Sequence, residues 1–303
     1  MSFLGEANEE EKRFYVDYKP EGMLVPRGRL SESLWRNHLI HADAKNQIST
    51  IYQMLVPAAR TAKGMELRQS GKLQGLDPRF KQDSATSTVT FAKTFFWTAQ
   101  ILGTIVPELY VRTDVAAGIT AVPSDPPASI AGQAVLSGFQ PSDLAFICAK
   151  HLSGYRGESY IRALFPTQSE LTIMFFAGVY LAAPNTPLPQ DIAPLVQRSA
   201  QALVKFMDAV QGEHLRAAVK QWMSEGSTAN IRRWMQGIEL TACRAALLVC
   251  GDLDIAKRIL ANEATLPGDL TPAEKMKELL LFSVSDDYAA LRQSLGVTIA
   301  VEE

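Results

Sequence analysis

The sequence predicts an α+β fold that is predominantly helical, with one small β-sheet packed on the helices. Apolar residues recur at helical spacing over most of the 303 residues. Between residues 107 and 136 this spacing gives way to short segments rich in β-branched and aromatic residues, separated by turn formers. A chain of this length with 47% hydrophobic residues buries a large core, as one or two domains.

The helical pattern is interrupted by glycine, proline and polar segments, which mark the ends of separate helices. At Thr271, a hydroxyl cap, Pro272 at the first helical position and Glu274 at the third form a clear start signal. No strict repeat is present, although paired helices of this length leave a helical-repeat architecture open. The pattern predicts helices at about residues 31–40, 47–62, 87–102, 141–154, 158–164, 168–181, 189–210, 213–224, 228–250, 253–261, 272–282 and 285–295.

Three strand candidates lie at residues 109–112, 118–122 and 128–132, ahead of the helix that begins at Pro141. Pro126 and Pro127 predict a loop before the third strand, because successive prolines cannot donate to a sheet ladder. A purely helical adaptor is the alternative, and it requires that residues 107–136 form no sheet.

The segment before the sheet differs in character from the rest. Residues 1 to about 30 mix charged residues with turn formers and predict an extended arm, and residues 71–84 are polar and predict a loop. We therefore expect residues 1–86 to form an N-terminal arm and helical subdomain, followed by a helical domain over residues 87–303 that contains the sheet.

Charge and composition exclude several classes of protein. The net charge of −2 gives no broad positive field, so nucleic-acid binding is not expected. The acidic amino terminus lacks the features of a secretory signal, and the longest apolar run is too short to span a membrane. Three cysteines without paired metal-knuckle spacing suit a reducing compartment. These observations predict a cytoplasmic protein without a membrane span.

The helix predicted at residues 141–154 has the flanks and spacing of a metallopeptidase active-site helix but the wrong residues. Zinc peptidases use His-Glu-x-x-His there, because side chains four apart on a helix share a face and aim two imidazoles at one ion. This chain has Lys150, His151, Leu152, Ser153 and Gly154 instead. A cation, an imidazole and a glycine cannot reproduce the roles of ligand, general base and second ligand.

The order of these elements resembles the zinc-peptidase family of HtpX and the CAAX prenyl endopeptidases, over roughly residues 87–262. In that family a small sheet, whose edge strand takes the substrate, leads into the metal helix. Residues 238–246 resemble its second metal helix, so Glu239 matches the third zinc ligand, while Cys243 stands where the family has an aspartate. The resemblance implies a gluzincin-like scaffold with Gly118, Ile119, Thr120, Ala121 and Val122 as a peptide-binding edge strand.

A second resemblance concerns the context in which such chains occur. The segments at residues 155–162 and 274–279 are similar to the carboxy-terminal part of some large bacterial tetratricopeptide-repeat proteins. This similarity implies a module that is associated with repeats, and it implies no activity.

The missing ligands predict a pseudopeptidase: a metal-free binding or scaffolding module, without cofactor, that binds a protein partner. Lys150 and Glu239 are expected to face each other across the vacated metal site, so that an ammonium substitutes for zinc. The alternatives are a solvent-facing Lys150, and a true hydrolase with relocated zinc ligands or a cysteine nucleophile. For a cysteine-dependent hydrolase, the candidate nucleophile pair is Cys148 and His151, which lie on one helix.

Overall fold

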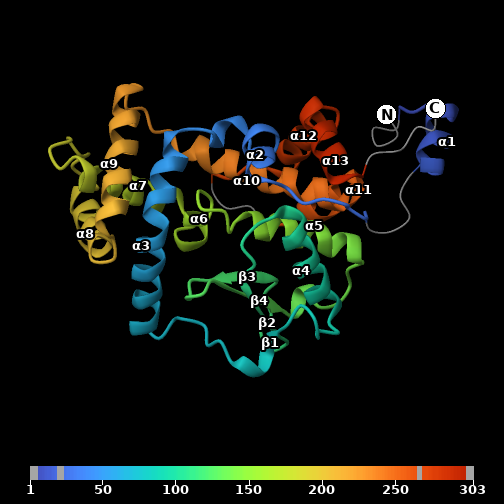
Figure 1. The fold of residues 1–303 in the computed structure, drawn as a ribbon, viewed down its shortest axis with the longest axis horizontal. Coiled ribbons are helices and arrows are strands. Elements are labelled where there is room, and N and C mark those ends of the chain that lie inside the picture. Colours follow the sequence, from blue (N-terminus) through green and yellow to red (C-terminus); the bar gives the residue numbers. More distant parts are fainter. Residues whose placement is uncertain (1–5, 19–23, 265–267, 298–303) are drawn as a thin grey trace.

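The computed structural model describes residues 6–18, 24–264 and 268–297, and it is a predominantly helical α+β fold with one small sheet (Figure 1). The α-helices are α1 (Glu9–Tyr18), α2 (Glu32–Leu34), α3 (Gln47–Gln69), α4 (Thr90–Leu102), α5 (Pro141–Ser153), α6 (Ile161–Leu164), α7 (Gln168–Ala182), α8 (Ala193–Val204), α9 (Ala209–Ser224), α10 (Ile231–Cys250), α11 (Leu253–Ala261), α12 (Pro272–Ser283) and α13 (Asp286–Leu295). Short helical turns are η2 (Trp35–Leu39), η3 (Ala42–Ala44), η4 (Pro78–Phe80) and η5 (Gln133–Val135).

The strands β1 (Lys81–Gln82), β2 (Glu108–Arg112), β3 (Ile119–Val122) and β4 (Ala128–Gly132) form a mixed sheet in the order β1-β2-β4-β3 within the described residues. β2 is parallel to β4, and β3 is antiparallel to β4. The three predicted strands are therefore confirmed, and the purely helical alternative is wrong. β1 lies in a segment that was predicted to be a loop, and it is only two residues long.

The sheet separates two apolar layers of unequal size. On one face, Leu109 and Ala131 join the main core, which includes residues from α3, α4, α5, α7 and α10. On the other face, Tyr110, Val122, Ala128 and Ile130 form a smaller cluster with side chains from the loop between α3 and β1. Successive strand residues point to opposite faces, so the side chains of Ile119 and Ala121 lie on the helical side.

Residues 30–59 belong to the same main core as the helices after the sheet. Buried side chains connect them to distant backbone: Trp35 donates to the carbonyl of Leu102 at 2.7 Å, and Tyr52 donates to that of Leu171 at 2.7 Å. The division of the chain at residue 86 stays a prediction.

Two helix predictions differ from the structure. Residues 9–18 form α1 where an extended arm was predicted; residues 1–5 and 19–23 of that arm lie outside the described residues. The helix predicted over 189–210 is interrupted, because Asp208 accepts from the backbone N–H of Gln211 and begins α9. None of the described helices has the length and apolar content that a membrane-spanning segment needs.

Candidate functional site

Helices α5 and α10 pack against each other through the centre of the molecule, above the sheet in Figure 1. Pro141 at the start of α5 pre-sets the helical φ angle, and the backbone N–H of Gln140 donates to the Asp143 carboxylate. The two helices bring Lys150 and Glu239 together, with Nζ 2.8 Å from Oε1. The predicted contact between these two side chains is therefore confirmed, and a solvent-facing Lys150 is excluded.

The contact is part of a larger ion-pair cluster that we call the central cluster: Lys150, Arg162, Glu239, Glu263, Asp269 and Lys275. The ammonium of Lys275 lies 2.7 Å from Oε1 of Glu239, and the guanidinium of Arg162 lies 3.5 Å from Oε2. Glu263 pairs with both lysines, and Arg162 pairs with Asp269 at 3.1 Å. Three cations thus neutralise three carboxylates.

Within the central cluster, the pKa values of Glu239 and Lys150 are shifted in favour of their charged forms although both side chains are largely buried. Burial by itself would raise the pKa of Glu239, but Lys150, Lys275 and Arg162 outweigh it and hold this pKa below its ordinary value. Burial likewise opposes the charge of Lys150, but the carboxylates of Glu239 and Glu263 outweigh it and hold the pKa of Lys150 above its ordinary value. Both directions favour a charged pair.

The other predicted positions lie around the central cluster without completing a metal site. Cys243 has its Sγ 4.0 Å from Oε1 of Glu239, and burial together with that carboxylate raises the pKa of its thiol to about 12. Gly154 caps α5 and offers no side chain. Among the described residues, no group of three or more His, Cys, Asp or Glu side chains is placed to hold a metal ion.

His151 takes part in a second polar group, formed with Ser129 of β4 and with Tyr155. Nε2 of His151 lies 2.8 Å from Oγ of Ser129, which lies 2.7 Å from the hydroxyl of Tyr155. The tyrosine hydroxyl in turn donates to the carbonyl of Ala128 at 2.7 Å.

This chain of contacts fixes the direction of every proton in it. A carbonyl only accepts, so the single proton of Tyr155 is directed at Ala128, and Ser129 must donate to Tyr155. Nε2 of His151 must therefore carry a proton and donate to Ser129, which leaves the lone pair on Nδ1. In this arrangement His151 is not a base toward Ser129, so the pair lacks the activated nucleophile of a serine hydrolase.

The cysteines are no better placed for nucleophilic chemistry. All three are buried and reduced, and burial raises the pKa of the Cys148 thiol above its ordinary value. Thiolates are the reactive form, and buried apolar surroundings disfavour them.

Burial lowers the pKa of His151 from 6.5 to about 3, which makes stability depend on pH. Between these values the unfolded chain binds a proton that the folded chain does not, so stability falls as the pH falls below 6.5. Each such group contributes a slope of up to about 1.4 kcal/mol per pH unit. We expect His151→Gln, which keeps a donor for Ser129, to reduce the wild-type slope between pH 6.5 and 5 in urea titrations. His41, whose pKa burial also lowers, leaves a residual slope. An unchanged slope in His151→Gln would contradict the assignment.

Strand β3 is an edge of the sheet, with β4 as its neighbour on one side. Gly118, predicted as part of this strand, precedes it, and its carbonyl accepts from the N–H of Gly132 at 2.7 Å. Hydrogen-bonded and non-bonded pairs alternate along an antiparallel ladder. Thr120 and Val122 therefore direct their backbone groups at β4, whereas Ile119 and Ala121 direct theirs away from the sheet. In the described part of the chain, no other backbone segment bonds to those outward groups.

A cavity of about 360 Å³ lies beside this edge, and we call it the β3 groove. β3 supplies one wall, and α5 with the segment after it supplies the other. Its lining residues are Thr120, Ala121, His151, Gly154, Tyr155, Tyr160 and Ala163. The structure thus brings the predicted edge strand next to His151 and Gly154. Of the three positions that replace the zinc-peptidase motif on and after α5, Lys150, His151 and Gly154, only Lys150 belongs to the central cluster.

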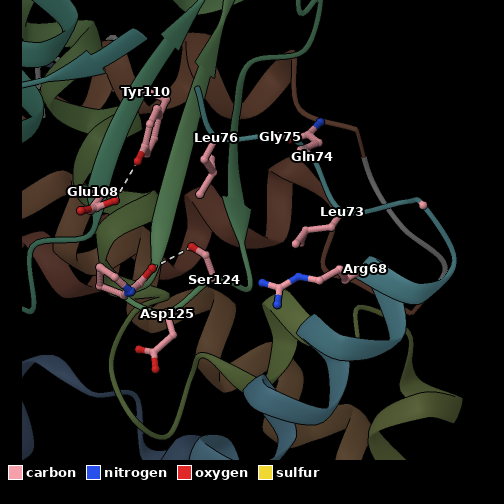
Figure 2. A pocket seen from close by; sticks show the side chains of 11 residues that line it. Arg68, Leu73, Gln74, Gly75, Leu76, Glu108, Tyr110, Ser124 and Asp125 are labelled. Atoms are coloured by element: carbon pink, nitrogen blue, oxygen red, sulfur yellow. Dashed lines mark hydrogen bonds between the residues drawn. The ribbon is translucent and has the colours of Figure 1, made fainter. Parts of the chain in front are cut away.

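A second cavity, of about 440 Å³, lies where the end of α3 and the loop after it meet Glu108, Tyr110 and residues 124–126 (Figure 2). Most of its polar groups are already paired: Tyr110 donates to Glu108, which also binds Lys81, and Ser124 donates to the carbonyl of Pro126. Figure 2 shows the guanidinium of Arg68 extending from α3 toward Ser124 and Asp125. Ser124 donates to a carbonyl, so it is not paired with a base.

Several members of these sites were not predicted from the sequence. Lys275 and Glu263 reach the central cluster by long-range packing, and no local pattern distinguishes them from surface charges. The position of Ser129 could have been predicted in part. Ser129 and Ala131 are two residues apart on β4, so Ser129 lies on the strand face that packs on the main core.

Comparisons with family models, with curated proteins and with solved structures found no match to this chain.

Proposed function

We propose that this protein is a non-catalytic peptidase-like module that binds an extended peptide segment of a partner protein along β3. The observation that carries the proposal is the open edge of β3, with the outward backbone groups of Ile119 and Ala121, next to the β3 groove. Strand addition uses backbone hydrogen bonds for affinity and neighbouring pockets for specificity, and it needs no catalyst.

The central cluster supports the non-catalytic half of the proposal. Glu239, which matches a zinc ligand of the peptidases, is bound by Lys150 and Lys275 at 2.8 and 2.7 Å. Both ammonium groups lie on Oε1, so a metal ion would have to displace them to reach that oxygen. The polar chain from His151 to Ala128 likewise leaves Ser129 without a base.

Strand addition is tested by removing one outward donor of β3. Ala121→Pro deletes an N–H that points away from β4, and proline is tolerated at such edge positions. Peptides are selected from a random displayed library on the immobilised protein, and their affinity is measured by fluorescence anisotropy. We expect Ala121→Pro to weaken binding by about tenfold or more, equivalent to about 1.4 kcal/mol, with an unchanged circular dichroism spectrum.

The selected peptide supplies a matched control. Two series of the peptide are methylated at alternate amides. Methylation of the amides that face β3 should abolish binding, and methylation of the amides that face away should leave it intact. Equal affinity of both methylated series and of Ala121→Pro would overturn strand addition. Elution of the free protein as a dimer that Ala121→Pro dissociates would assign the edge to a second copy of the chain, and would also overturn the proposal.

A further inference from the structure

The residues that line the β3 groove carry no full charge. Three are aromatic rings, His151, Tyr155 and Tyr160, and the rest are Thr120, Gly154 and two alanines. His151 is neutral over the physiological range because burial lowers its pKa to about 3. A charged side chain entering this space would lose hydration without gaining a partner, which is costly.

Tyr155 and Tyr160 both line the groove. Their ring centroids lie 5.2 Å apart, and both side chains are almost completely buried. The Tyr155 hydroxyl is directed at the carbonyl of Ala128, and the Tyr160 hydroxyl lies 3.4 Å from the carbonyl of Val122. Their polar ends are therefore engaged inside the protein.

Gly154 lines the groove together with these rings and β3. Its φ of −68° and ψ of −14° are accessible to any L-residue, so the backbone does not demand glycine there. A Cβ added at this position would meet one atom within 4 Å, the carbonyl oxygen of His151 at 3.1 Å. A larger side chain at residue 154 would consequently grow into the β3 groove.

Two polar atoms of the groove-lining residues have no hydrogen-bond partner among the described residues: Oγ1 of Thr120 and Nδ1 of His151. The proton chain through Ser129 places the lone pair of His151 on Nδ1, and no described residue donates to that atom. Neutral imidazole nitrogens accept well from N–H groups.

From these contacts we infer that the partner segment places an uncharged, apolar side chain over Gly154 and a hydrogen-bond donor against Nδ1 of His151. This inference rests on the proposed function and specifies the chemistry of the segment that β3 takes. The apolar side chain fills the groove against the rings of Tyr155 and Tyr160, and the donor pairs with the remaining lone pair.

The test uses the peptide selected on the wild-type protein, with each position replaced in turn by Leu, Lys and Glu. We expect one position at which Leu binds at least about tenfold more tightly than Lys or Glu, since burying an unpaired charge costs more than 1.4 kcal/mol. Gly154→Leu should abolish that preference and weaken binding of the Leu peptide. Gly154→Ala, which adds a single methyl group, should have a smaller effect in the same direction.

Gly212→Leu is the matched control, because Gly212 lies in α9 away from the groove and a Cβ there meets only the Arg216 guanidinium, at 3.6 Å. It should leave affinity and preference unchanged. To check the acceptor, the ¹⁵N shift of Nδ1 is measured with and without peptide; a shift toward the hydrogen-bonded value is expected.

Different results would overturn the proposed function and the inference about the chemistry of the bound segment. Equal binding of Leu, Lys and Glu at every position, or a preference that survives Gly154→Leu, would overturn this inference even if Ala121→Pro still weakens binding. Binding that is insensitive to Ala121→Pro would instead overturn the proposed function itself. An Nδ1 shift that does not change on peptide binding would remove the acceptor role of His151.

Discussion

Replacement of Glu239 by alanine is expected to lower the free energy of unfolding by about 3 to 5 kcal/mol, the usual cost of removing one partner from a buried ion pair. The side chain of Glu239 is 14% exposed and pairs with Lys150, Lys275 and Arg162. Its removal leaves three buried cations facing only Glu263 and Asp269. Urea denaturation followed by circular dichroism measures the change.

Glu213→Ala supplies the control for this experiment. Glu213 pairs with Arg216 at 2.6 Å, but both side chains are at least half exposed, so the loss should stay within about 0.5 kcal/mol. A change below about 1 kcal/mol in Glu239→Ala, comparable to that control, would show that the central cluster contributes little.

Replacement of Lys150 by alanine is expected to lower the free energy of unfolding less than replacement of Glu239 does. In Lys150→Ala, Glu239 retains Lys275 and Arg162, and Glu263 retains Lys275. The loss should therefore be smaller than in Glu239→Ala. In a double-mutant cycle the two substitutions should be non-additive, because each removes the same 2.8 Å contact.

Particular elements show how much of the fold could be predicted from the sequence. Local signals predicted α12, whose capping box of Thr271 and Glu274 is present, and the break before α9 was also encoded, in Asp208 and Gln211. The break was missed because apolar residues continue across it. α3 continues to Gln69, beyond its predicted end at residue 62, and residues 65–69 are all good helix formers.

The candidate site was likewise predicted only in part. Lys150 and Glu239 were paired because helix spacing and the order of elements constrain two helices at once. Lys275, Glu263 and Asp269 come from the chain after α11, and only the packing of α11 and α12 against α5 and α10 brings them in. The open edge of β3 was expected from the family resemblance, whereas its outward residues follow from the register with β4.

Restoring metal ligands is expected to convert the central cluster into a zinc site, which tests the peptidase resemblance directly. An imidazole nitrogen together with a bond of about 2 Å to zinc reaches about as far as a lysine ammonium. A histidine at position 150 would then hold zinc close to where Nζ of Lys150 now contacts Glu239. A second histidine at position 154, the C-cap of α5, shares the helix face of residue 150 and supplies the remaining nitrogen ligand from the side of the β3 groove.

The variant is Lys150→His, Gly154→His and Lys275→Ala, the last because the Lys275 ammonium would compete with zinc for Glu239. We expect one equivalent of zinc after dialysis, and tetrahedral absorption bands when cobalt replaces it. Lys150→His alone should bind no metal, and adding Glu239→Gln to the triple variant should abolish binding. A folded triple variant that takes up no metal would mean that residues 150, 154 and 239 do not converge on one point. In that case the scaffold would not be that of a zinc peptidase, and β3 would have to be judged as a binding edge on its own geometry.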